Sequence, residues 1–377
     1  MNNFARDVAD RRQTVLILSS QKRTDATGVR VYCDALERMF QSIAGVNVIR
    51  ICWSDSSLAW QRLVVLLLKV SRLLGRGAQQ VAHRWGGAML TWRLLREYRL
   101  LCPIVLAQDP ISGAVAQWMG LKVWCVCHFS DPIEEIYRAE KFGPITRRMI
   151  AWTMRFFLAR NERYIVLSSS AAKMMEVYAP KSRREIIPTI CRYDVLGKPK
   201  VHEGVRMVMM GRLEDLKGQR RLVEALGLLK DMEVELWLLG EGPDRMLLEE
   251  AATRNGVREK VKFLGFVADP RPLLQQCDLY IHSSRMEAFA LVCVEAIVSG
   301  VPAWSYETPG YNDFHCFDGT PYLPQTTSAQ QLANYIREFV KQSPESRKRL
   351  LEQQQACAKR FLPKSVQQAY CHLLGID

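Results

Sequence analysis

The sequence lacks several patterns that would assign it to a common class of protein. No Cys-x-x-Cys pair occurs among its 11 cysteines, which are odd in number and lie in apolar segments. Neither a zinc site nor a disulfide framework is indicated, so a reducing cytoplasm is the expected location. The first 13 residues, MNNFARDVADRRQ, lack the apolar core of a secretory signal peptide.

Long hydrophobic runs are absent as well. The longest candidate, residues 63–68, ends at Lys69, whereas a membrane-spanning helix needs about 18 or more apolar residues. The sequence therefore predicts no spanning helix. An apolar fraction of 48% is still enough for sizeable cores, and a length of 377 residues suggests two domains.

Acidic residues are in deficit, with 39 Asp and Glu against 52 Lys and Arg and a formal net charge of +13. This balance predicts an anionic partner, which could be nucleic acid, anionic lipid or a phosphorylated small molecule. No RNP, zinc-finger or helix-turn-helix pattern is present, so nucleic acid is not the expected partner. The chain also has no Asp-x-Asp motif and no His/Asp cluster with ligand spacing, so neither a metal nor a cofactor is expected.

Short apolar runs alternate with helical patterns in two successive series. The runs are rich in Val and Ile and largely unalternating, as in strands that are covered on both faces. Expected strands are 14–20, 46–51, 103–107, 122–127 and 164–167 in the first series, and 205–210, 233–239, 261–264, 279–282 and 302–306 in the second. A polar stretch at 195–204 separates the two series.

This pattern predicts an α/β fold with two facing, doubly wound Rossmann-like domains and a ligand cleft between them. We expect an N-terminal domain at 1–197 and a C-terminal domain at 204–355. Residues 356–377 are expected to form a helix that packs back toward the N-terminal domain.

Glycine-rich turns follow three strands of the second series. GRLEDLKG, residues 211–218, presents backbone amides and a helix start to an anion, and Arg212 and Lys217 add charges suited to a pyrophosphate. A solvated basic loop is the alternative. LLGEGP contains Gly240 and Gly242, and a tight βα turn is the simpler interpretation of it. In FLGFV, Gly265 would let a flat base approach the backbone.

The stretch SSRMEAFALVCVEAIVSG sets Glu287 and Glu295 in a largely apolar run. Eight residues of helix leave two side chains about 80° apart, so the acids do not share one helix face. We expect Glu287 on a loop and Glu295 inside the helix that follows, both pointing into one ligand cleft. The alternative is one surface acid and one helix-capping acid.

The ordered series GRLEDLKG, LLGEGP, VKFLGFV, CDLYIHSS, E-x7-E and SGVP resembles the C-terminal half of the retaining family 4 glycosyltransferases, which have the GT-B fold. The resemblance covers about 205–310 and reaches more weakly into the N-terminal half. It implies that the domain at 204–355 binds the nucleotide sugar and that the domain at 1–197 binds the acceptor. It implies transfer of a sugar, with retention, from a UDP- or GDP-linked donor to a glycan or lipid-linked acceptor. Bacterial envelope polysaccharide or lipopolysaccharide synthesis is the expected setting. A nucleotide-sugar epimerase of the same fold and an inactive nucleotide-sugar-binding subunit are the alternatives.

The resemblance also implies roles for individual residues. Arg212 and Lys217 would neutralise the donor diphosphate without a metal, Glu287 would meet the hydroxyls of the donor sugar, and Glu295 would accept from the ribose hydroxyls. A donor phosphate oxygen would take the proton of the attacking acceptor hydroxyl. The backbone amides of Ala290, Leu291 and Val292 would hold phosphate oxygens. The remaining expected donor-binding residues are Gly28, Gly211, Gly240, Gly242, Phe266 and Val267.

Four positions bear on this assignment. His128 ends a strand and is similar to the family histidine near the donor sugar, although a lone histidine can be structural. Gly28 stands where the family often has a glycine pair. Ala288 and Ala290 flank Phe289 where the family usually has glycine, and the Cβ of Ala290 would narrow the approach of the backbone to a phosphate.

Residues 58–100 form a basic, apolar arm that is separate from the glycine motifs. In one helix, the cations at 62, 69, 72 and 76 would lie within an arc of about 80°. Residues 62–99 hold eight Lys or Arg and one acid, Glu97, together with Trp85 and Trp92. This pattern predicts a helix lying on an anionic membrane surface, and hence a peripheral membrane protein. A core helix with a solvated stripe and a dimer contact are the alternatives.

Overall fold

The computed structural model describes residues 13–20, 28–73, 75–101, 103–128, 143–193, 203–285, 287, 289–308 and 323–376. The chain forms two compact units. The first comprises Met1–Ile190 and Val366–Asp377, and the second comprises Cys191–Ser365. Most of the linker expected at 195–204 lies outside the described residues.

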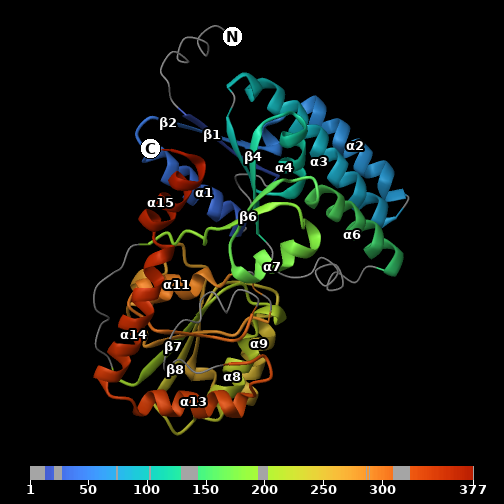
Figure 1. Ribbon diagram of the computed structural model, residues 1–377. Helices are drawn as coiled ribbons and strands as arrows, with labels where there is room; N and C mark the ends of the chain where they lie inside the picture. Colours follow the sequence, from blue (N-terminus) through green and yellow to red (C-terminus); the bar gives the residue numbers. More distant parts are fainter. Residues whose placement is uncertain are drawn as a thin grey trace. The chain divides into compact units, whose positions relative to one another are not determined.

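The first unit is built on a six-stranded sheet in the order β2-β1-β3-β4-β5-β6 (Figure 1), with parallel pairing throughout. Its strands are β1 (Gln13–Ser19), β2 (Val46–Cys52), β3 (Ile104–Ala107), β4 (Lys122–Cys127), β5 (Arg163–Val166) and β6 (Arg183–Ile186). The central strands are buried along nearly their whole length, as parallel strands covered on both faces must be.

Helices α1 (Gly28–Gln41), α4 (Pro110–Trp118), α7 (Ser169–Tyr178) and α15 (Pro363–Leu374) accompany this sheet. The last of them completes the core of the first unit, because Val366, Tyr370 and Leu374 are buried in the same cluster as Leu36 and other residues of α1. The hydroxyls of Tyr32 and Tyr370 form a buried hydrogen bond of 2.6 Å. The final segment of the chain is therefore part of the first unit.

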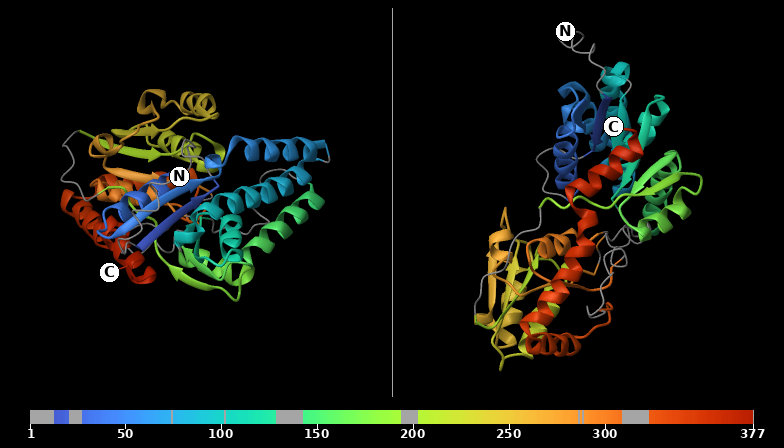
Figure 2. Two further views of the ribbon diagram at one scale, coloured as in Figure 1. Left: turned by 90° about the horizontal axis from the view of Figure 1, so that it is seen from above. Right: turned by 60° about the vertical axis from the view of Figure 1, so that its left-hand side comes forward.

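Three further helices lie side by side in the first unit: α2 (Leu58–Leu73), α3 (Arg76–Tyr98) and α6 (Pro144–Leu158) (Figures 1 and 2). Glycines on α3 permit this packing. A Cβ on Gly86 would lie 2.7 Å from Val64 of α2, and one on Gly77 would lie 3.0 Å from Thr146 of α6. Within the described ranges, no helix is both long enough and apolar enough to cross a membrane.

The continuous helix expected through residue 76 is wrong. α2 ends at Leu73, and Gly75, with a φ of 102°, precedes the first residue of α3. Such a φ is readily adopted only by glycine, so the chain turns there. Arg76 therefore begins the next helix and does not extend the row of cations on α2.

The second unit contains a five-stranded parallel sheet in the order β11-β10-β7-β8-β9. Its strands are β7 (Val205–Met210), β8 (Val234–Leu239), β9 (Val261–Gly265), β10 (Leu279–His282) and β11 (Ala303–Ser305). Its helices are α8 (Gln219–Gly227), α9 (Arg245–Arg254), α10 (Arg271–Leu274), α11 (Leu291–Val298), α13 (Ala329–Lys341) and α14 (Pro344–Ala358).

The order of the second sheet creates a topological switch point. From β7 the chain adds β8 and β9 on one side and then returns to place β10 and β11 on the other. The loops that leave the carboxyl ends of the adjacent strands β7 and β10 therefore run to opposite sides of the sheet. Ligands of open α/β sheets bind at such a point.

Candidate functional site

The loop that leaves β7 is held close to the backbone of its neighbours. Gly211 donates its N–H to Leu239 O at 2.9 Å, and Leu213 donates to Glu241 O at 3.0 Å. The loop then forms a 3₁₀ turn, Asp215–Lys217, which ends at Gly218 with a φ of 70°. A Cβ at Gly218 would lie 2.2 Å from the carbonyl oxygen of Ser283. Glycine is thus required for the loop after β7 to approach the loop after β10.

Gly240 and Gly242 support the loop that follows β7. A Cβ on Gly240 would lie 2.1 Å from Gly211 O, and one on Gly242 would lie 2.2 Å from Leu213 O. Real Cβ atoms do not approach backbone oxygens so closely, so both positions exclude any side chain. The glycines of LLGEGP therefore allow two βα turns to stack on each other.

Lys217 and Glu287 meet at the switch point. Lys217 Nζ donates to Glu287 Oε2 at 2.6 Å, and both side chains are about a quarter exposed. Lys217 comes from the loop after β7 and Glu287 from the loop after β10, 70 positions later in the chain. The sequence motifs GRLEDLKG and E-x7-E are thus brought together in one ion pair.

His282, the last residue of β10, lies beside this pair. Its Nε2 is 3.7 Å from Glu287 Oε2, and its side chain is 1% exposed. Burial and the charge of Lys217 lower the pKa of His282 to about 3, so the imidazole is neutral at physiological pH. Nε2 has no hydrogen-bond partner in the part of the chain that the structure describes. His282 was not identified as a site residue from the sequence, although it stands at a strand end within the CDLYIHSS motif.

Arg212 is more exposed than Lys217. Its side chain is about two-thirds exposed, and its Nε lies 3.4 Å from Glu214 Oε2. Its carbonyl oxygen accepts a hydrogen bond of 2.8 Å from the buried Gln219 side chain. The backbone at Arg212 is therefore fixed while the guanidinium can still reorient, because a surface ion pair contributes little stability.

Glu295 lies inside α11, as expected, and its side chain is buried. Its Oε1 accepts a hydrogen bond of 3.1 Å from Arg192 Nε. Burial raises the pKa of the Glu295 carboxyl, and the guanidinium of Arg192 opposes this rise. Arg192 was not identified from the sequence, because no local pattern relates residues 103 positions apart.

Ala290 forms a tight turn at the start of α11. Its φ of −78° and ψ of 66° are those of an inverse γ-turn, and Leu291 donates its N–H to Phe289 O at 2.9 Å. An L-residue adopts this conformation without strain, so glycine is not required at 290. The amide of Leu291 is already engaged, which leaves the amides of Ala290 and Val292 as the better placed of the three expected phosphate donors.

The end of β9 presents an exposed phenylalanine. Gly265 has a φ of 68°, Phe266 is exposed and Val267 is half-buried. Nearby in the second unit, the Tyr193 ring lies between two guanidiniums, with Arg192 5.0 Å and Arg271 4.6 Å from its centroid. Val267 and Tyr193 pack in the same hydrophobic cluster.

His128 ends β4 in the first unit. Its Nε2 lies 2.9 Å from Gln108 Oε1, and the Gln108 amide nitrogen donates to Leu106 O at 3.2 Å. Because the glutamine oxygen only accepts, the neutral imidazole carries its proton on Nε2 and presents Nδ1 as an acceptor. Burial lowers the pKa of His128 to about 4. Gln108, at the end of β3, was not identified from the sequence.

Gly28 is the first residue of α1. A Cβ built there would meet no atom within 4 Å, so packing among the described residues does not require glycine at this position. Asp109, which was not identified from the sequence, lies at the switch point between β1 and β3. Its carboxylate accepts from Ser20 N at 3.2 Å and caps α4 through Ser112 N at 2.8 Å, and burial raises its pKa.

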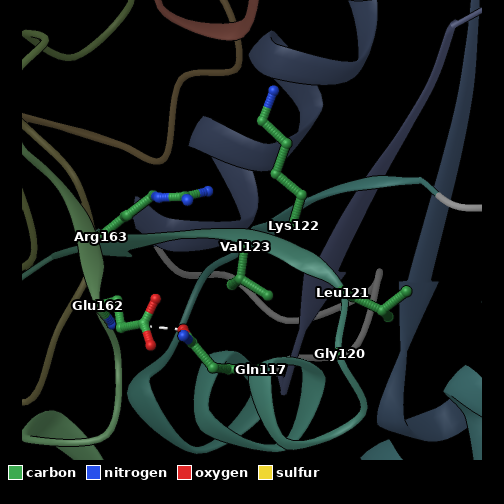
Figure 3. Close-up of a pocket in the computed structure, with 7 residues that line it drawn as sticks. All are labelled: Gln117, Gly120, Leu121, Lys122, Val123, Glu162 and Arg163. Atoms are coloured by element: carbon green, nitrogen blue, oxygen red, sulfur yellow. Dashed lines mark hydrogen bonds between the residues drawn. The ribbon is translucent and has the colours of Figure 1, made fainter.

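A cavity of about 260 Å³ lies elsewhere in the first unit (Figure 3). Lys122 and Arg163, which line it, are the first residues of β4 and β5. It therefore opens at the amino ends of the strands, whereas ligands of such sheets bind at the carboxyl ends. None of the expected site residues lines it.

Two family models match the chain. The model for glycosyl transferases group 1 matches residues 197–356, and the model for glycosyltransferase family 4 matches residues 26–190. Together they cover every described strand except β1 and the helices from α1 up to most of α14.

Individual relatives and solved structures agree with these models. YqgM of Bacillus subtilis, an uncharacterized glycosyltransferase, is 26% identical over 72% of this chain and 77% of its own length. The lipopolysaccharide core biosynthesis glycosyltransferase LpsE of Rhizobium meliloti is 31% identical over 45% of this chain, so the match spans about half of that relative. The crystal structure of Anabaena HepE in complex with UDP has a TM-score of 0.71 at 18% identity, covering 96% of this chain and all of that one. At 18% identity, the similarity to HepE shows a shared fold only.

Proposed function

Because the chain belongs to the family 4 glycosyltransferases with the GT-B fold, we propose that it transfers a sugar from a nucleoside-diphosphate sugar to a hydroxyl of a glycan or lipid-linked acceptor, with retention of anomeric configuration. The observation that carries the proposal is the ion pair between Lys217 and Glu287 at the switch point of the second sheet. The pair puts one cation and one carboxylate that can accept hydrogen bonds at the point where ligands of open α/β sheets bind.

The two members of the pair suit the two ends of the scissile bond. As the bond from the anomeric carbon to the diphosphate breaks, negative charge grows on the leaving oxygen. Lys217 would stabilise that charge, with Arg212 reorienting from Glu214 to assist. Glu287 would accept from hydroxyls of the donor sugar. Donor binding would thus exchange the Lys217–Glu287 contact for contacts to the phosphate and to the sugar.

The residues around Glu295 suit the nucleoside. Its buried carboxylate would accept from the ribose hydroxyls, while the exposed Phe266 and the half-buried Val267 would lie along the base. Arg192 donates to Glu295 and would share that carboxylate with the ribose. HepE, a neighbour in fold, was solved with UDP and with UDP-glucose, which supports a UDP-linked donor over a GDP-linked one.

We further propose that the reaction needs no divalent metal. Lys217, Arg212 and the amides of Ala290 and Val292 at the start of α11 would together offset the charge of the diphosphate. The acceptor hydroxyl would attack on the face from which the diphosphate departs, and a phosphate oxygen would take its proton. His128 Nδ1 would accept a hydrogen bond from a hydroxyl of the donor sugar, because a neutral imidazole with its proton on Nε2 has a lone pair on Nδ1.

The acceptor is proposed to be a lipopolysaccharide core or a related envelope glycan. The support comes from the names of relatives, which include LpsE and LpsD of Rhizobium meliloti and the lipopolysaccharide glucosyltransferase WaaG of Escherichia coli, 27% identical over 55% of this chain. We place the reaction at the cytoplasmic face of the membrane, where such acceptors are assembled on lipid.

The test is release of UDP from UDP-glucose by the purified full chain, with and without a truncated lipopolysaccharide core as acceptor, in EDTA and in magnesium. We expect release that depends on the acceptor, proceeds in EDTA and yields an α-linked product by NMR. Inversion at the anomeric carbon, or a rate abolished by EDTA, would contradict the corresponding part of the proposal.

The same assay separates the two alternatives. A nucleotide-sugar epimerase would convert UDP-glucose or UDP-N-acetylglucosamine into an isomer without any acceptor. An inactive binding subunit would bind UDP, detected by thermal shift, yet release none from any of the UDP- and GDP-sugars offered. Either outcome would replace the proposal.

A further inference from the structure

Three tryptophans gather on the first unit around Phe156 of α6. The ring centroid of Phe156 lies 6.0 Å from Trp85 of α3, 6.2 Å from Trp118 of α4 and 6.1 Å from Trp152 of α6. We refer to these four residues as the aromatic cluster. Its tryptophans are 43%, 51% and 65% exposed, in the same order. Three helices thus contribute large rings to one partly open surface.

An exposed patch of this kind marks a site of contact, because soluble proteins seldom expose contiguous apolar surface. Tryptophan in particular prefers the boundary between hydrocarbon and water, where the ring is buried and the indole N–H remains wet. The aromatic cluster has this composition.

The exposed face of α6 extends the cluster. Ile145, Met149 and Trp152 are spaced i, i+4 and i+7, so they lie along one face of the helix, and all three are exposed, Ile145 by 75%. On the other side of α3, helix α2 also leaves most of its apolar side chains in solvent, namely Leu58, Leu63, Val65, Leu66, Leu67, Val70 and Leu73. Only two residues of α2 are buried.

Cations accompany these apolar residues. α6 carries Arg147, Arg148 and Arg155 and no acidic residue. The guanidinium of Arg160 lies 4.7 Å from the Phe156 centroid, and that of Arg96 lies 5.0 Å from the Trp92 centroid. An arginine stacked on an aromatic ring keeps its N–H groups available to a phosphate at the ring edge.

From this arrangement we propose that the aromatic cluster and the exposed face of α6 dock on an anionic lipid surface. The rings and aliphatic side chains would enter the interface, and the arginines would contact phosphate headgroups. A second copy of this chain fits the surface less well, because it would bring the arginines of α6 against one another. A glycan could stack on the tryptophans but would not cover the leucines of α2. The inference concerns lipid binding and does not depend on the proposed sugar transfer.

The test is flotation of the full chain with vesicles of phosphatidylcholine alone or with phosphatidylglycerol added, combined with tryptophan fluorescence and quenching by brominated lipid. We expect flotation with the anionic vesicles, a blue shift of the emission and quenching by bromine in the acyl chains. Bromine in the acyl chains quenches only tryptophans that enter the bilayer, so a purely electrostatic contact at the surface would give no quenching.

Two sets of variants locate the contact. Ile145→Ser, Met149→Ser and Trp152→Ser together should lower the vesicle partition coefficient by at least about tenfold, because apolar burial drives interfacial binding. Val177→Ser, Met246→Ser and Leu247→Ser form the matched control, since these residues are also exposed but lie outside α6. Arg148→Gln, Arg155→Gln and Arg160→Gln should lower it by roughly fivefold per charge, whereas Arg254→Gln, Lys341→Gln and Lys348→Gln should do so much less.

Circular dichroism should first show that each variant is folded, so that a change in binding can be attributed to the substituted side chains. A selective loss in the α6 variants supports the proposal. Equal binding by the α6 and control variants, equal binding to neutral and anionic vesicles, or no flotation at all overturns it. So does a fluorescence shift with soluble oligosaccharide but not with vesicles, or a concentration-dependent dimer that the α6 variants abolish.

Discussion

Lys217 is the residue on which the proposed chemistry depends most directly, since it is the partner of Glu287 and the cation proposed to stabilise the departing diphosphate. Lys217→Ala should lower the rate of sugar transfer by about 100- to 1000-fold, the range measured when a single donor to a developing oxyanion is removed. Steady-state kinetics on the donor would show the loss in kcat more than in KM.

Lys262→Ala is the matched control for this change. Lys262 also pairs with a glutamate, 3.1 Å from Glu235 Oε2, but on the exposed surface, so its loss should leave the rate within about twofold, as a surface pair is worth less than about 1 kcal/mol. A Lys217→Ala enzyme as fast as the parent would remove the basis of the proposed site.

The buried His282 should make the free energy of unfolding depend on pH. Burial lowers its pKa from the ordinary histidine value of 6.5, which the unfolded chain regains, to about 3 in the folded chain. Between these two values the unfolded chain binds a proton that the folded chain does not. The free energy of unfolding should therefore fall as the pH drops below 6.5, by up to about 1.4 kcal/mol per pH unit for this one residue. At higher pH its contribution is constant.

Urea titrations at intervals between about pH 7.5 and 5 would measure this slope. His282→Gln should flatten it. The remaining slope should include the parts due to His128, whose pKa of about 4 acts in the same direction, and to His83, whose pKa burial also lowers. His372→Gln, which changes an exposed histidine, should leave the slope unaltered. An unchanged slope in His282→Gln would mean that the imidazole is not buried as a neutral group.

At the scale of elements, the stacking of two glycine turns is the tightest constraint in the second unit. Gly242→Ala would place a Cβ 2.2 Å from Leu213 O, which the backbone can relieve only by moving the loop after β7. We expect a loss of about 2–4 kcal/mol in unfolding free energy. Gly143→Ala, where a Cβ would meet nothing within 4 Å, should change stability by less than about 0.5 kcal/mol, and equal effects from both changes would refute the steric account.

The edge strand β11 depends on one side chain of α14. Gln354 is fully buried, accepts from Ala303 N at 2.8 Å and donates to Ala303 O at 2.8 Å. Gln354→Leu should cost about 2–4 kcal/mol, because it leaves a buried backbone donor and acceptor without these bonds. Gln353→Leu, its exposed neighbour, should be nearly neutral in the same denaturation experiment.

Most elements could be predicted from the sequence because parallel strands are apolar on both faces. β4, β7 and β10 begin and end at the predicted residues. β6 was not predicted, since its residues Arg183–Ile186 are mostly charged and lie at the sheet edge, where one side of the strand stays in solvent.

The candidate site was predictable only in part. Glu287 was expected on a loop and Glu295 inside the helix that follows, and the structure has Glu287 before α11 and Glu295 within it. The pairing of Glu295 with Arg192 and of His128 with Gln108 could not be inferred, because these partners come together only when distant strands and loops are assembled. The break between α2 and α3 was missed because a single glycine in a leucine-rich run is a weak signal in one sequence.

At the scale of the whole molecule, the proposed donor should act on one unit. UDP at about 100 times its dissociation constant should stabilise the protein by about 2.7 kcal/mol. Hydrogen exchange should slow mainly in the second unit, in the loop 211–218 and at the start of α11, where the phosphates and the ribose are proposed to bind. Adenosine diphosphate is the control, and protection confined to the first unit would contradict the assignment of the donor site.

The incorporation of α15 into the first unit has a consequence for synthesis. Tyr370 and Leu374 fill a core whose other members begin at Val15, so that core cannot close until α15 has been translated. The whole of the second unit, Cys191–Ser365, precedes α15 in the chain. The second unit can therefore fold before the core of the first unit is complete, the reverse of the usual order in which domains mature.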